Sequence, residues 1–73
     1  MQNNAILIVS NILSNMRQLY QCEIKLEYRE KPNDYIISCV NSSAFKQIFN
    51  VLEALKNNTL NYYLRDKETF VIF

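Results

Sequence analysis

The chain has 73 residues, and its eight Lys and Arg nearly balance its seven Asp and Glu. It contains no His, no Gly and no Trp. Without His there is no Ser-His-Asp or Cys-His nucleophile and no imidazole metal ligand, and without Gly there is no glycine-rich phosphate loop. The composition therefore predicts one small α+β domain that is not an enzyme, with no catalytic residues, no metal and no cofactor.

Residues 3–20 carry apolar side chains at spacings of three and four, which predicts an amphipathic helix. Asn3 or Asn4 is its expected N-cap. The apolar run at 5–9 is too short for a secretion signal or a membrane span. We therefore expect a cytoplasmic protein that does not contact a membrane.

Residues 22–30 alternate between apolar and charged side chains, which predicts a strand with one buried face. After a Pro-Asn-Asp turn, residues 35–40 are almost continuously apolar, as is typical of a central strand. If this hairpin places Leu26 opposite Cys39, Cys22 lies about 13 Å from Cys39. A disulfide needs a much shorter separation, so we expect two free thiols.

The second half of the chain repeats this pattern. One of the Asn and Ser residues at 41–43 is the expected N-cap of a helix over 44–55. With no Gly available, an Asn at 57–58 is the expected left-handed stop of that helix. Two further strands are predicted at 60–65 and 69–73, around a charged turn.

At an offset of 36 residues, the apolar positions of the first helix and strand align with apolar positions of the second. Residues 3–40 and 42–73 are therefore expected to form two α-β-β units within one domain that spans 1–73. Two such units can bury both helices on one side of a single sheet. The predicted fold is a two-layer α+β sandwich, α-β-β-α-β-β, with a four-stranded antiparallel sheet in the order 1-2-4-3. The alternating strands, 22–30 and 60–65, are its expected edges.

In topology this arrangement resembles a ferredoxin-like sheet that is circularly permuted so that its first strand comes last. The same order of elements occurs in the core of LAGLIDADG homing nucleases. The glycine-containing helix and the acidic metal ligands of that family have no match in this sequence. The resemblance therefore implies a fold and does not imply an activity.

A sheet with both helices on one side leaves its other face open. The repeat gives residues 69–73 the same orientation as 35–39, which turns Phe70 and Ile72 outward. A three-residue turn would instead expose Val71 and Phe73. Either arrangement yields an apolar stripe of a kind that soluble monomers seldom expose. The residues expected to bind a protein on this face are Ile36, Ser38, Val40, Tyr63, Phe70 and Ile72.

These features predict a non-enzymatic protein-interaction module that binds a partner, or a second copy of itself as a homodimer, through the open face. By analogy with other compact single-domain proteins, we expect an inhibitor or regulator of phage or mobile-element type, such as an anti-CRISPR-like protein. The alternative is a nucleic-acid-binding protein that uses Lys25, Arg29, Tyr63 and Arg65. The near-zero net charge favours a protein partner.

Overall fold

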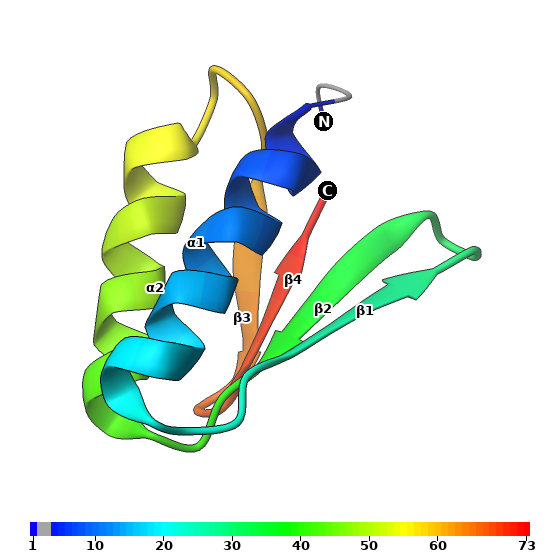
Figure 1. The fold of residues 1–73 in the computed structure, drawn as a ribbon. Helices are drawn as coiled ribbons and strands as arrows, with labels where there is room; N and C mark the ends of the chain where they lie inside the picture. Colours follow the sequence, from blue (N-terminus) through cyan, green and yellow to red (C-terminus); the bar gives the residue numbers. More distant parts are fainter. Residues whose placement is uncertain (2–3) are drawn as a thin grey trace.

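A computed structural model describes residue 1 and residues 4–73 of the chain. It has two layers, with both helices lying together on one side of an antiparallel sheet of four strands (Figure 1). The order of the strands is β1-β2-β4-β3. This confirms the predicted fold. The elements are α1 (Ala5–Tyr20), β1 (Lys25–Arg29), β2 (Asp34–Ser38), α2 (Ser42–Leu55), β3 (Tyr62–Asp66) and β4 (Thr69–Ile72).

Helix α1 forms as its periodicity predicts and ends without a glycine. Gln21 follows the helix with φ of 49°, in the left-handed region, and its backbone N–H donates to the carbonyl of Arg17. Gln has a steric cost in this conformation that Gly would avoid. Asn4 holds the N-cap position, as predicted, but its side chain makes no capping hydrogen bond. The other candidate, Asn3, lies outside the described residues. The buried residues of α1 are Ala5, Val9, Leu13 and Met16.

The first hairpin has the predicted faces but a different register. Leu26 pairs with Ile37 and not with Cys39, so the predicted register is wrong by two residues. The reason is a longer turn at 30–33, in which Asn33 adopts φ of 71°. A shift of two residues keeps each side chain on its predicted face of the sheet.

The corrected register changes the relation between the two cysteines. Both are free thiols, as predicted, with Cys39 buried and Cys22 half-buried. Burial is the main cause that raises the pKa of Cys39, and a direct interaction with Cys22 raises it further. The observed register, which pairs Lys25 with Ser38, also brings Cys22 two residues closer to Cys39 along the strands than expected, so the expected separation of about 13 Å is too long. A buried thiol with a raised pKa stays protonated and is a poor nucleophile.

Helix α2 begins with a capping contact that satisfies one of its free backbone donors. The Asn41 side chain accepts a hydrogen bond of 2.9 Å from the backbone N–H of Ala44. Asn41 is thus the N-cap among the three predicted candidates. Beyond the other end of the helix, Asn57 adopts the predicted left-handed conformation, with φ of 72°. It does not cap the helix, because the C-cap of α2 is Lys56, with ψ of 142°, and the backbone N–H of Asn57 donates to the carbonyl of Leu60.

The second hairpin contains an irregularity that the first hairpin lacks. Leu64 pairs with Phe70, but Asp66 pairs with Thr69, so Arg65 is an extra residue in β3. Such a β-bulge of one residue reverses the face of the sheet to which each side chain beyond it points. The Asp66 carboxylate closes the turn by accepting a hydrogen bond of 2.9 Å from the backbone N–H of Glu68.

The core lies between the two helices and the sheet. Phe70 is at its centre, since its ring stacks on Phe45 at 4.2 Å between ring centroids and meets Tyr62 edge-on at 5.9 Å. From α2 the core takes Ala44, Ile48 and Leu52, and from the sheet layer it takes Ile24, Ile37, Cys39, Leu60, Phe70 and Ile72.

Candidate binding surface

The sheet face opposite the helices is defined by alternation along each strand. Ile37, Phe70 and Ile72 face the helices, so their neighbours in sequence face the other way. The register then aligns Glu27, Ile36, Val71 and Tyr63 in one row across all four strands. We call this surface the open face; its residues are Lys25, Glu27, Arg29, Asp34, Ile36, Ser38, Tyr63, Thr69 and Val71, with Val40 and Phe73 just beyond the strand ends.

Four of the six residues predicted for this face lie on it. Ile36 and Ser38 are half-buried there, whereas Val40 and Tyr63 are 75% and 49% exposed. That these residues bind a protein remains a prediction.

The other two predicted residues, Phe70 and Ile72, lie on the opposite side. Both have 0% exposure and belong to the core beneath the helices, so their placement on the open face is wrong. The bulge at Arg65 is the physical reason, because one extra residue reverses the facing of β4 relative to the repeat. The alternative considered from the sequence, with Val71 and Phe73 on the open face, matches the structure.

The open face is less apolar than the sequence indicated, because its centre is covered. Val71 has 0% exposure although it lies on this face. On the same face, Arg29 donates two hydrogen bonds to the Asp34 carboxylate, at 2.7 and 2.6 Å. The predicted stripe is therefore interrupted, and its exposed apolar groups lie in two places. One is Val40, and the other is the pair Tyr63 and Phe73, whose ring centroids lie 6.1 Å apart.

The Pro-Asn-Asp pattern predicts a turn that includes Asp34, whereas in the structure Asp34 begins β2 and pairs with Arg29. The hydrogen bond from Arg29 lowers the pKa of the Asp34 carboxyl. The same bond is the main cause that raises the pKa of Arg29, and the Tyr63 phenol adds to it. Opposite charges flanking a turn were the available signal, since cross-strand partners of opposite charge stabilise a hairpin.

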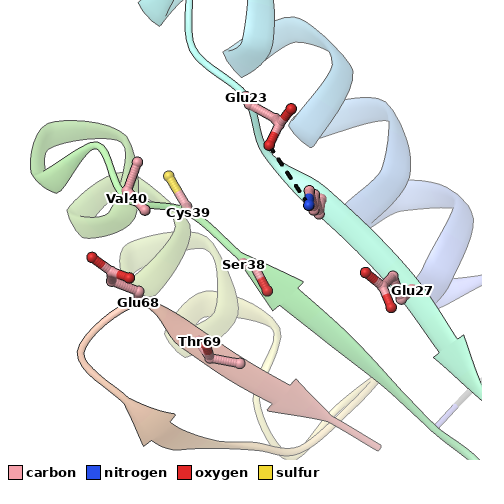
Figure 2. Close-up of a pocket in the computed structure, with 8 residues that line it drawn as sticks. Glu23, Glu27, Ser38, Cys39, Val40, Glu68 and Thr69 are labelled. Atoms are coloured by element: carbon pink, nitrogen blue, oxygen red, sulfur yellow. Dashed lines mark ion pairs between the residues drawn. The ribbon is translucent and has the colours of Figure 1, made fainter.

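A hollow of about 300 Å³ lies at the end of the open face where β1, β2 and β4 meet the loops. Figure 2 shows Glu23, Glu27 and Glu68 around it, with Ser38 and Thr69 on the strands between them. With Lys25, the rim has three formal negative charges and one positive charge, a net charge of −2. Glu23 and Lys25 form an exposed ion pair at 3.9 Å, and Val40 supplies an apolar edge to the hollow. This arrangement favours a cationic group next to an apolar one.

The basic residues predicted for nucleic-acid binding all have carboxylate partners. Lys25 pairs with Glu23, Arg29 pairs with Asp34, and Arg65 pairs with Asp66 at 3.9 Å. A phosphate group would have to displace these carboxylates or bind beside them, which weakens the electrostatic attraction on which nucleic-acid binding depends.

The described part of the chain lacks two other kinds of site. No three Asp, Glu, Cys or His side chains of residue 1 and residues 4–73 gather in a way that could hold a metal ion. Over the same residues, neither helix combines the length and the hydropathy that a membrane crossing requires.

Comparison of the chain with family models, with curated proteins and with solved structures finds no match. The geometry of the open face is therefore the basis for a functional proposal.

Proposed function

We propose that this domain is a non-enzymatic protein-interaction module that binds a partner through the hollow end of the open face. The observation that carries the proposal is the negative rim of the hollow beside the exposed side chain of Val40. A Lys or Arg side chain of a partner that enters the hollow would meet a net negative charge. An apolar side chain next to it in the partner would cover Val40. The partner that fits is therefore a protein segment with a basic and an apolar residue side by side.

Nucleic acid is the second candidate, and the charges of this face support it less. Polyanions bind where cations are in excess. Here the three candidate cations are already paired with carboxylates, and the hollow on this face has an acidic rim.

A module of this kind acts by covering part of its partner, which is consistent with the role of a small inhibitor or regulator. A phage or mobile-element setting, as for anti-CRISPR-like proteins, remains part of the proposal, and so does a cytoplasmic location. The two free thiols support that location, because thiols stay reduced in the cytosol.

The proposal is tested with labelled probes of opposite charge. Fluorescence anisotropy is measured with a short Lys/Leu peptide, with the matching Glu/Leu peptide and with a single-stranded RNA. We expect the Lys/Leu peptide to bind most tightly and to weaken as salt is added. The double variant Glu23→Lys and Glu68→Lys changes the rim from −2 to +2. It should weaken binding of the Lys/Leu peptide about tenfold or more and should strengthen RNA binding.

The matched control is Glu30→Lys, since Glu30 is exposed in the β1–β2 turn and does not line the hollow. The control should bind the Lys/Leu peptide like the original protein. The proposal is wrong if the original protein does not bind that peptide, if the control loses as much affinity as the double variant, or if RNA binds more tightly.

A further inference from the structure

Among residue 1 and residues 4–73, no strand lies beside the outer edge of β3. β3 pairs with β4 on one side and is the last strand of the sheet. Asn61 and Phe73 exchange both of their backbone hydrogen bonds, at 2.8 and 2.9 Å. Because bonded and non-bonded pairs alternate in an antiparallel ladder, the backbone N–H and C=O groups of Tyr62 and Leu64 point away from β4.

The two edges of the sheet differ in how they are protected. β1 carries Lys25, Glu27 and Arg29 along its length, and charges on an edge strand discourage pairing with another chain. The first three residues of β3 read Tyr-Tyr-Leu and carry no charge, and the charged residues Arg65 and Asp66 follow only at its end. Tyr63 on the open face is 49% exposed, and Leu64 on the helix side is 52% exposed. β3 therefore offers both unpaired backbone groups and apolar side chains on its two faces.

We propose that two copies of this chain associate through their β3 strands, which pair antiparallel about a twofold axis at Tyr63. Tyr62 of one copy then exchanges both backbone hydrogen bonds with Leu64 of the other, and the reverse pair does the same. The axis runs perpendicular to the sheet, so all four helices of the dimer stay on one side. The two open faces then form one continuous surface across eight strands.

The side chains of β3 suit a second copy as the occupant. In this register Arg65 of one copy lies opposite Asn61 of the other, so no like charges face each other across the junction. On the helix side, Leu64 of each copy lies beside Tyr62 of the other. The Tyr62 ring already meets the exposed ring of Phe49 edge-on, at 6.1 Å between centroids. Each copy therefore covers an apolar group that the other leaves in water, as a symmetric interface requires.

The first test is the mass of the protein in solution, measured by sedimentation equilibrium over a wide concentration range. The original chain should be a dimer at the upper concentrations. Leu64→Lys places two cations at the junction and should weaken the dimer about tenfold or more. The matched control is Leu7→Lys, because Leu7 is 63% exposed on α1, away from β3. The control should remain a dimer.

The second test needs no substitution and therefore does not depend on the folding of a variant. Amide hydrogen exchange is followed by NMR at low and at high protein concentration. The amides of Tyr62 and Leu64 should exchange rapidly when dilute and become protected when concentrated. A monomer at every concentration, a dimer that Leu64→Lys leaves intact, or fast exchange of both amides at all concentrations would overturn the proposal. None of these results depends on peptide binding, so the proposed function is tested separately.

Discussion

The direction in which β4 faces can be tested by making the same substitution at Phe70 and at Phe73. Phe70→Leu keeps an apolar side chain in the core but removes two ring contacts, with Phe45 and with Tyr62. Each aromatic pair contributes about 0.5–1.5 kcal/mol, so the free energy of unfolding should fall by about 1–3 kcal/mol. Phe73 is 46% exposed and has one ring contact, with Tyr63. Phe73→Leu should therefore cost about 0.5–1.5 kcal/mol, about half of the loss at Phe70.

Urea unfolding followed by circular dichroism measures both losses. A domain of this size has a total stability of about 4–11 kcal/mol, and replacing Phe70 by Ala would remove about 3–5 kcal/mol of it. Leu is the better choice because the variant keeps enough stability to show a full transition. An unchanged slope against urea would show that only the stability has changed. A loss at Phe73 equal to or larger than that at Phe70 would mean that Phe70 lies on the open face, as the repeat predicted, and not in the core.

Asn41→Ala should lower the free energy of unfolding by about 1 kcal/mol through loss of the α2 cap, whereas Ser43→Ala should leave it nearly unchanged; equal losses in urea would contradict this capping role. Gln21→Gly should raise the thermal midpoint, with a gain of about 0.5–1 kcal/mol, because Gly adopts the left-handed conformation without steric cost; no gain would contradict the strain argument. Folding lowers the pKa of Asp34 from its ordinary value of 3.8. The ion pair with Arg29 therefore stabilises the protein fully above pH 3.8, and this stabilisation is lost as the pH falls through the lower pKa of the folded state. Urea midpoints measured from neutral to acid pH should therefore fall less steeply in Asp34→Asn than in the original protein, and equal slopes would contradict the assignment.

The sequence was sufficient for the helices, for the strands and for their order. These depend on periodicity, which is repeated over many residues, so no single position decides the result. The spacing of apolar residues along α1 and α2 was enough to place both helices on one side. The register error in the first hairpin did not change the predicted faces, because a shift of two residues leaves each side chain on the same face of the sheet.

The facing of β4 could not be obtained in this way, because it depends on a single residue. The repeat assumed a second turn two residues shorter than the first. The bulge at Arg65 takes up one residue. This difference of one residue turns Phe70 toward the helices and Val71 toward the open face. Bulges arise from local backbone and side-chain geometry and have no periodic signature. For the same reason the sequence predicts an apolar stripe, whereas the structure has a hollow with a negative rim. The hollow forms only where the β3–β4 turn brings Glu68 close to β1 and β2.

The central position of β4 has a consequence for synthesis on the ribosome. β2 and β3 lie on its two sides, and neither contacts the other without it (Figure 1). During translation, both helices and three strands are complete before the residues that join the two halves of the sheet have been made. The core that both helices form around Phe70 and Ile72 therefore cannot close until these two residues have emerged. At translation rates of about 5–20 residues per second, this delay lasts for seconds, which is long enough for chaperones or other nascent chains to bind.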